Sequence, residues 1–233
     1  MKIRVASYNI HKGVGLDRKR DPERIMTVLR EIDADVIALQ EADRRIGQRA
    51  AVLPRTLIDD MPWQVVPVAR RPRSIGWHGN ALLVRRGWRV VGSAALDLPM
   101  LEPRGAASLD CEADGRLFRL IGTHLDLSGL RRRDQVRSLL EHVEDASRDC
   151  PTIIAGDFNQ WGRLTGAMRE FDGGWQVISP GRSYPSRAPV ARLDRIVTSP
   201  GWECLGAEVH HSPLAAVASD HLPIWADLRL SDN

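Results

Sequence analysis

Short runs of apolar residues alternate along this chain with segments whose apolar residues recur at helical spacing. Residues 3–9 are β-branched and apolar enough for a buried strand, and residues 35–41 (DVIALQE) form a second run that ends in polar residues. Between them, Asp21-Pro22 predicts a helix start, because Asp can cap a helix and Pro is tolerated at its first position. The apolar stripe of this helix follows at Ile25, Val28, Leu29 and Ile32.

The rest of the chain predicts further strands and helices. Strands are expected at residues 81–84, 89–95, 106–111, 117–124, 152–159, 193–198 and 224–230. Helices are expected over roughly residues 131–147, and as short segments near residues 53–59 and 164–171. Paired strands in mid-chain argue against a purely parallel sheet. We therefore expect an α/β fold of two packed mixed sheets with helices outside, formed by residues 1–233 as one domain.

Composition and charge narrow the class of protein. Hydrophobic residues make up 43% of the 233 residues and charged residues 27%, which excludes wholesale disorder. The formal charge of +3 is too small to indicate nucleic-acid binding by itself. All but three of the 33 basic residues are Arg, a bias that fits either genomic base composition or phosphate binding by the planar guanidinium.

The cysteines and the apolar runs bear on the compartment. Cys111, Cys150 and Cys204 are widely spaced and form no CxxC pair, which favours a reducing compartment over a disulfide framework or a structural zinc site. The sequence contains no run of about 18 apolar residues, and its N-terminal apolar stretch is too short for a signal peptide. We expect a cytoplasmic monomer with no obligate protein partner.

Polar side chains recur where the predicted strands end. They are Asn9, Gln40-Glu41, Thr123-His124, Asp157 to Asn159, and Ser219-Asp220-His221 before the last strand. Each has an ordinary structural explanation alone, such as a turn cap, but their recurrence predicts a site on a rigid scaffold. Carboxylate and amide oxygens suit Mg²⁺ or Mn²⁺, and a hard cation beside histidines is typical of phosphate-ester hydrolysis.

A series of short motifs, in chain order, resembles the endonuclease/exonuclease/phosphatase superfamily, whose fold is named after deoxyribonuclease I. The motifs are SYN (7–9), LQE (39–41), GNALL (79–83), PRGA (103–106), GTHL (122–125), GDFN (156–159), LDRI (193–196) and SDHLPI (219–224). GDFN and SDHLP are specific, whereas SYN and LQE are weak alone but lie where the family has them. The resemblance covers nearly the whole chain and implies a four-layer α/β/β/α sandwich.

The resemblance also implies roles for the catalytic residues. Asp157 corresponds to the residue that positions or deprotonates the attacking water, and Asn159 to the amide that orients this residue and donates to the phosphate. His221 corresponds to the histidine on the scissile phosphate, and Asp194 to the carboxylate that pairs with it. His124 resembles a second phosphate-contacting histidine or a general acid.

The metal and substrate positions follow in the same way. Glu41 resembles the principal ligand of the Mg²⁺ or Mn²⁺ ion, with Asn9 beside it and Asp220 near. Arg104 is a candidate phosphate clamp and Asn80 a candidate site-lining amide. Arg45 lies in an arginine cluster after Glu41 that suits an anionic substrate, although such clusters are more often solvated surface.

One departure separates the chain from the exonuclease III and abasic-site endonuclease branch. That branch has a catalytic Tyr just before a Val-Pro-Asn segment, whereas this chain has THLDLSG and no Tyr between Tyr8 and Tyr184. A histidine here resembles the deoxyribonuclease I, sphingomyelinase and phosphoinositide-phosphatase branches. A DNA-repair nuclease is therefore disfavoured.

The family motifs report the reaction centre and leave the substrate open. We expect a Mg²⁺- or Mn²⁺-dependent phosphoesterase that hydrolyses a phosphodiester of nucleic acid or phospholipid by in-line attack of an activated water. The alternatives are a phosphomonoesterase acting on inositol phosphates or another small metabolite, and an inactive phosphate-binding module. The full set of acids and histidines argues against the inactive module. The number of metal ions stays open.

Overall fold

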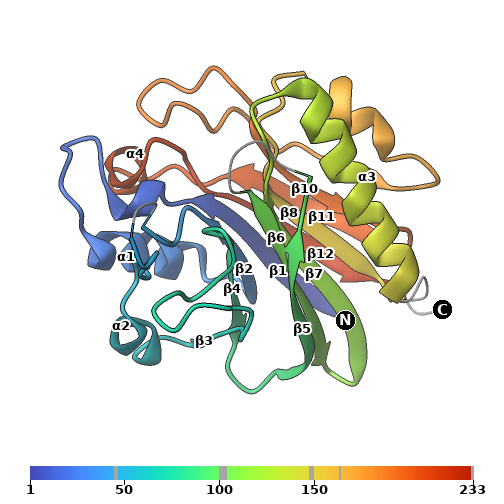
Figure 1. Ribbon diagram of the computed structural model, residues 1–233, viewed down its shortest axis with the longest axis horizontal. Helices are drawn as coiled ribbons and strands as arrows, with labels where there is room; N and C mark the ends of the chain where they lie inside the picture. The colour runs from blue at the N-terminus through green and yellow to red at the C-terminus, as the bar shows by residue number, and fades with distance from the viewer. Residues whose placement is uncertain (45–46, 100–103, 147–149, 163, 232–233) are drawn as a thin grey trace.

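The computed structural model describes residues 1–44, 47–99, 104–146, 150–162 and 164–231, and its strands form two six-stranded sheets (Figure 1). The first sheet has the order β11 (Trp202–Val209), β12 (Ile224–Leu230), β1 (Lys2–Asn9), β2 (Val36–Gln40), β4 (Ala81–Arg85), β3 (Trp63–Val65). The second has the order β5 (Arg89–Asp97), β6 (Gly105–Ala113), β7 (Arg116–His124), β8 (Thr152–Asp157), β10 (Asp194–Thr198), β9 (Gln176–Ile178).

Each sheet has a parallel pair near its centre, while the other described neighbours are antiparallel. Helix α1 (Pro22–Ile32) connects β1 to β2, and helix α3 (Gly129–Ala146) connects β7 to β8, because parallel strands need a crossover. Across the sandwich, β1 packs against β8 and β2 against β7. This arrangement gathers strand ends from both sheets.

Apolar clusters separate four layers, which confirms the α/β/β/α sandwich expected from the sequence. Between the sheets lie side chains that include Val5, Leu82, Leu109, Leu120 and Ile196. On the outer face of the first sheet, α1 packs through residues that include Ile25 and Leu29. On the outer face of the second sheet, α3 packs through residues that include Val136 and Leu139. Figure 1 shows α1 and α3 on opposite sides of the two sheets.

The sheets approach closely just before the end of β7. A Cβ added at Gly122 would lie 2.6 Å from Leu82 Cδ2 and 3.2 Å from the Cβ of Ala38. A larger residue at position 122 would therefore push β7 away from the first sheet. This contact lies two residues before His124, so it helps to set the position of that histidine.

Helix α1 begins as predicted, with Asp21 accepting a hydrogen bond from Arg24 N at 3.0 Å and Pro22 in the first turn. Helix α3 begins two residues earlier than expected, and residue 147 lies outside the described residues. The shorter helices are η1 (His11–Gly13), α2 (Arg55–Asp59), η2 (Gly166–Glu170) and α4 (Ala215–Ala218). None of the helices in these described ranges has the length and apolar character needed to cross a membrane.

The structure adds strands that the sequence analysis did not predict. Strands β3 and β9 have three residues each, too few to show an alternating pattern. Strand β11 contains a register shift between Cys204 and Gly206, which interrupts the period-two pattern. The segment expected as a short helix near residues 164–171 is a 3-10 helix, η2, and the strand expected to reach residue 159 ends at Asp157.

Candidate active site

The candidate residues gather where the parallel strands of both sheets end. Asn9 is the last residue of β1, and Glu41 follows β2 directly. His124 and Asp157 end β7 and β8, where they stand opposite each other. In the first sheet, Asn9 at the end of β1 stands opposite Gln40 at the end of β2. The predicted clustering of strand-end side chains is therefore observed.

Asp157 lies at the centre of the cluster and is 1% exposed. Its Oδ2 accepts a hydrogen bond from Asn9 Nδ2 at 3.1 Å, and its Oδ1 accepts one from the backbone N–H of Asn159 at 2.9 Å. The Nε2 atoms of His124 and His221 lie 3.4 and 3.6 Å from Oδ2. Groups from both sheets thus fix the orientation of this carboxylate.

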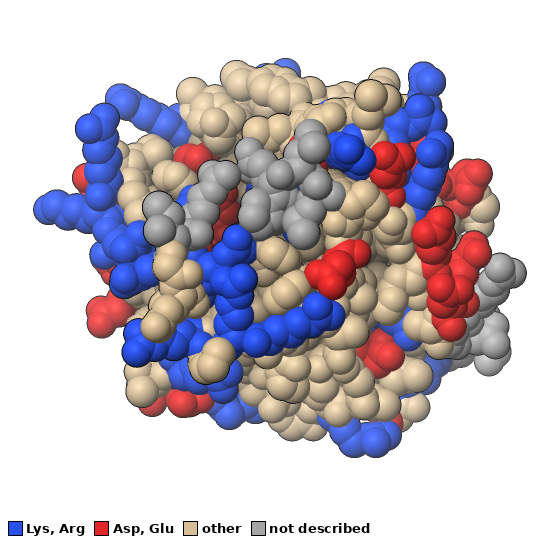
Figure 2. All heavy atoms as spheres, viewed as in Figure 1, with Lys and Arg blue, Asp and Glu red and all other residues tan. Residues whose placement is uncertain are grey.

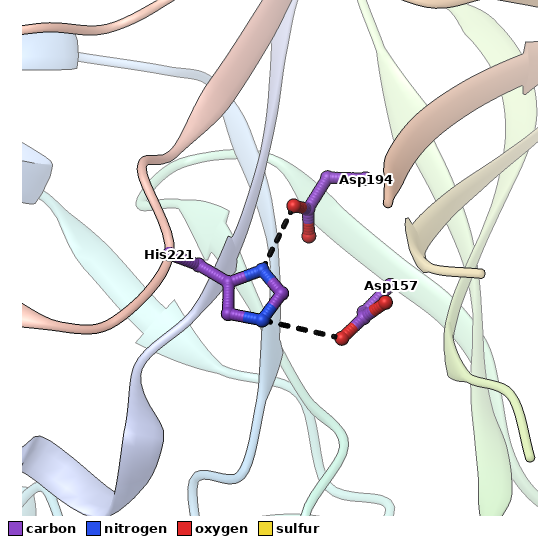
Figure 3. Close-up of side chains that lie close together, drawn as sticks. All are labelled: Asp157, Asp194 and His221. Atoms are coloured by element: carbon purple, nitrogen blue, oxygen red, sulfur yellow. Dashed lines mark hydrogen bonds and ion pairs between the residues drawn. The ribbon is translucent and has the colours of Figure 1, made fainter. Parts of the chain in front are cut away.

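His221 lies between two carboxylates (Figure 3). Asp194 stands opposite Asp157 in the antiparallel β10–β8 pair, and the loop before β12 inserts His221 next to both. The Nδ1 of His221 is 2.9 Å from Asp194 Oδ2, which also accepts a hydrogen bond from the hydroxyl of Ser183. The ring of Tyr184 packs on the imidazole with centroids 4.8 Å apart.

The two carboxylates decide the charge of His221. Burial by itself lowers the pKa of His221, but the charges of Asp194 and Asp157 and the hydrogen bond to Asp194 raise it to about 10. At neutral pH the ring is therefore an imidazolium, with a proton on each nitrogen. Such a ring can donate a hydrogen bond from Nε2 to an anionic oxygen.

His124 is the opposite case. Burial lowers the pKa of His124 to about 3; Asp157 opposes this shift, while Arg104 and His221 add to it. Arg104 Nη1 is 2.5 Å from His124 Nε2, and since a guanidinium can only donate, Nε2 is the acceptor. His124 is thus neutral and holds Arg104 beside the cluster. Two histidines with opposite protonation states around one carboxylate are suited to different tasks.

Oxygen donors surround the end of β1 and could hold a divalent cation. The ammonium of Lys12 donates a hydrogen bond to Glu41 Oε2, so this carboxylate already faces a cation. Ser219 Oγ donates to the backbone oxygen of Asn9 at 2.7 Å and lies 3.4 Å from Asp220 Oδ1. Two carboxylates and an amide oxygen fit Mg²⁺ or Mn²⁺ better than zinc.

A second possible ligand group has a different explanation. One ligand atom each of Asp157, Asp194 and His221 lies within 4.8 Å of the others. Nδ1 of His221 lies 2.9 Å from Asp194 Oδ2 and its Nε2 lies 3.6 Å from Asp157 Oδ2, so each nitrogen of the ring already faces a carboxylate. The positive ring itself accounts for the two carboxylates around it. The oxygen atoms near Glu41 are therefore the better candidates for the metal.

The remaining predicted residues lie around this centre. Asn80 is buried and donates from Nδ2 to the backbone oxygen of Gly105 at 2.9 Å, which links the two sheets. Its Oδ1 has no hydrogen-bond partner within the described part of the chain. The side chain of Asn159 donates to the backbone oxygen of Leu125 at 2.9 Å. Arg45 lies outside the described residues.

Lys12 is a site residue that the sequence analysis did not single out. A signal was present, because it is one of only three lysines in a chain with 33 basic residues and lies three positions after Asn9. Its contact with Glu41 could not be predicted. The contact depends on residues 11–12 adopting positive φ angles, 44° at His11 and 57° at Lys12.

Comparison with protein families gives a match to the "Endonuclease/Exonuclease/phosphatase family" over residues 6–221. The uncharacterized protein YbhP of Escherichia coli strain K12 is 27% identical over 249 residues, covering 98% of this chain and 96% of that protein.

Solved structures share the fold. The human Nocturnin catalytic domain with bound sulfate has a TM-score of 0.76 at 22% identity, covering 99% of this chain and 95% of that one. A D. rerio TDP2 complex with a single-strand DNA product has a TM-score of 0.74 at 16% identity, covering 98% and 99%. A mannosyl-6-phosphatase from Bacteroides thetaiotaomicron has a TM-score of 0.73 at 19% identity, covering 98% and 100%.

Proposed function

Because this chain belongs to the endonuclease/exonuclease/phosphatase family, we propose that it is a metal-dependent phosphoesterase that hydrolyses a phosphodiester with an activated water. The observation that carries this proposal is the buried Asp157 carboxylate, which lies between a neutral histidine and a histidinium. An acceptor for the proton of water and a cationic donor for the phosphate are thus adjacent. In-line hydrolysis of a phosphate ester needs both groups.

Asp157 is the proposed base. Its Oδ2 accepts the proton of the attacking water as oxygen approaches phosphorus on the side opposite the leaving group. The side chain of Asn9 and the backbone N–H of Asn159 donate hydrogen bonds to this carboxylate at 3.1 and 2.9 Å. The carboxylate is therefore oriented before the reaction, so little conformational entropy is lost in reaching the reactive geometry.

His221 and Arg104 are the proposed phosphate ligands. The imidazolium of His221 donates from Nε2 to a non-bridging oxygen, and Asp194 keeps the ring charged and fixed through Nδ1. Arg104, placed by His124, donates to the same phosphate. Both cations face the charge that builds up on the phosphate oxygens in the transition state.

Glu41, Asn9 and Asp220 are the proposed ligands of Mg²⁺ or Mn²⁺. When bound, the ion supplies charge neutralisation at a phosphate oxygen and can lower the pKa of a bound water. The ammonium of Lys12, which donates to Glu41 Oε2, then competes with the ion for this carboxylate.

We also infer that residues 1–233 act as one catalytic domain and as a monomer. Every proposed catalytic and metal-binding residue comes from this one chain, so the site needs no second copy. Three cysteines without disulfide bonds fit a reducing compartment. A phosphomonoesterase is the second candidate, because a phosphatase shares the fold.

A hydrolysis panel on the purified protein tests this function. It includes bis(4-nitrophenyl) phosphate, single- and double-stranded DNA, RNA, sphingomyelin, glycerophospholipids and phosphoinositides, each with Mg²⁺, Mn²⁺ or EDTA. We expect metal-dependent turnover that falls by about a thousandfold or more in Asp157→Asn. Asp60→Asn, which changes an exposed acid at the end of α2, is the matched control and should keep full activity. Equal activity of Asp157→Asn and the wild type would exclude the mechanism.

A further inference from the structure

Four apolar side chains protrude from the surface beside the reaction centre and take no part in the mechanism above. They come from the segments that follow β7 and β8, and together they form what we call the apolar patch: Leu127, Leu130, Trp161 and Leu164. Their exposed fractions are 65%, 76%, 65% and 59%, and no other large apolar residue in the described ranges is as exposed. Single exposed apolar residues are common on protein surfaces, but four at one place indicate an interaction surface.

A shared arginine shows that the two segments of the patch are neighbours. Arg132 Nη1 donates to the backbone oxygen of Leu127 at 2.6 Å, and Arg132 Nε donates to Gln160 Oε1 at 3.3 Å. Leu130 lies two residues before this arginine in the first turn of α3. Trp161 directly follows Gln160. The segment after β7 and the segment after β8 therefore meet at the side chain of Arg132.

A second hydrogen bond brings the remaining patch residue to the same place. Gln160 Nε2 donates to Thr165 Oγ1 at 3.3 Å, and Leu164 directly precedes Thr165. Helix η2 begins one residue later and packs against α3. The four apolar residues thus share one surface at the start of α3 and η2.

The patch adjoins the reaction centre, because both of its segments begin at a proposed site residue. His124 lies three residues before Leu127, and Asp157 lies four residues before Trp161. Burial lowers the pKa of the Arg132 guanidinium, and the negative charge of Asp157 is near enough to oppose this shift. A surface that covers the patch would therefore lie next to the phosphate that is cleaved.

Positive charge surrounds the patch. Residues 126–137 and 160–170, which carry it, contain six arginines and three acidic residues. One of the acids, Glu170, accepts hydrogen bonds from Arg133 Nε and from Arg137 Nε, each at 2.8 Å, so two cations face this carboxylate. The surroundings of the apolar side chains are therefore cationic and complement an anionic partner.

Further exposed apolar residues lie at the same end of the sandwich. Leu16 follows β1, Val190 precedes β10 and Val217 precedes β12. Figure 1 shows the blue loop before α1, helix α4 and the orange loop before β10 along the upper left of the view. In the same view, Figure 2 shows basic side chains at the left and largely uncharged residues along the upper edge. The remaining exposed large apolar residues lie within strands: Val91, Leu117 and Leu205.

Protruding side chains of this composition fit a lipid surface better than a small ligand. A ligand pocket buries the residues that line it, whereas each patch residue is more than half exposed. Tryptophan suits the boundary between head groups and acyl chains, because its ring is apolar and its N–H is polar. Leucine beside tryptophan, with arginine around them, is typical of surfaces that lie on a bilayer. Anionic lipids attract such arginines.

We propose that the apolar patch docks the protein onto an anionic lipid bilayer, with the reaction centre next to the lipid head groups. Trp161 and the three leucines enter the head-group region, and the surrounding arginines contact lipid phosphates. The docking itself needs no catalysis. That a head-group phosphodiester is then the substrate rests on the proposed phosphoesterase function.

Co-sedimentation of the full chain with lipid vesicles measures the docking. One set of vesicles is phosphatidylcholine alone, and the other contains equal amounts of phosphatidylcholine and phosphatidylglycerol. We expect binding to the anionic vesicles to be about tenfold tighter or more, because the arginines are attracted to the negative surface. Added salt should weaken this binding, because it screens the attraction.

A double variant tests the apolar patch itself. Leu130→Gln combined with Trp161→Gln should lower the affinity for the anionic vesicles by about tenfold or more, since two apolar side chains no longer leave water on docking. Both residues are exposed, so the fold should be retained, which thermal unfolding checks. Val91→Gln combined with Leu117→Gln changes exposed apolar residues of β5 and β7 and is the matched control. It should bind as the wild type does.

The outcomes separate this inference from the proposed function. A wild-type protein that does not bind anionic vesicles, or a Leu130→Gln/Trp161→Gln variant that binds them equally well, overturns the docking surface. Without vesicle binding, a loss of single-stranded DNA binding in this variant would indicate a nucleic-acid surface, and dissociation of a dimer would indicate a contact between copies; either result overturns the proposal. Failure of the proposed function shows separately, as turnover of soluble bis(4-nitrophenyl) phosphate that does not depend on Asp157.

Discussion

Replacing Asp194 with Asn tests the electrostatic argument for His221 directly. The substitution keeps the size of the side chain and removes the charge that lies 2.9 Å from Nδ1. Raising the pKa of His221 from 6.5 to about 10 corresponds to roughly 5 kcal/mol in favour of the imidazolium. Burial opposes this preference, and the charge of Asp194 is the largest contribution in favour of the imidazolium. In Asp194→Asn we expect the pKa of His221 to fall into the neutral range.

The change in stability has a defined dependence on pH. Because the folded-state pKa of His221 lies above its ordinary value, protonation stabilises the folded protein fully below about pH 6.5, and this contribution is lost as the pH rises toward 10. The variant lacks most of the contribution. We expect its free energy of unfolding to be lower by about 3 kcal/mol near pH 6, with a smaller difference near pH 9.5.

Urea unfolding at the two pH values and a pH titration of the His221 imidazole by NMR measure these effects. Activity should fall by about a hundredfold or more, since the charged ring that binds the phosphate is lost at neutral pH. Ser183→Ala is the control, because it removes a hydrogen bond to the same carboxylate oxygen and leaves the charge in place. A wild-type pKa near 6.5, or a loss of stability that does not depend on pH, would refute the reasoning.

Two further substitutions test the neighbouring contacts. In Arg104→Met, kcat/KM should fall by about ten- to a hundredfold because a hydrogen-bond donor to the phosphate is lost. The pKa of His124, measured by NMR titration, should rise because a nearby positive charge is removed. An unchanged pKa of His124 would contradict the contact between these two residues. In Lys12→Met, the affinity for Mn²⁺ measured by calorimetry should increase, because the ammonium no longer competes for the Glu41 carboxylate; unchanged or weaker Mn²⁺ binding would count against Glu41 as the shared ligand.

Much of the scaffold could be predicted from local patterns. The apolar runs at residues 3–9 and 224–230 correspond to β1 and β12, and the Asp21-Pro22 signal to the start of α1, because these elements are long or have clear end signals. Strands β3, β9 and β11 were missed because short length or a bulge hides the alternation. Their places depend on the sheet that they join.

The sequence by itself determined which residues could form a reaction centre and in which order they occur. Asn9, Glu41, His124 and Asp157 each follow an apolar run, and that pattern is local. Only the tertiary structure decided that His221 lies between Asp157 and Asp194, and that His124 accepts from an arginine. Two histidines of one chain thus have pKa values near 10 and near 3. The reason is that a pKa depends on burial and on the distance to other charges, and residues far apart in the chain set both.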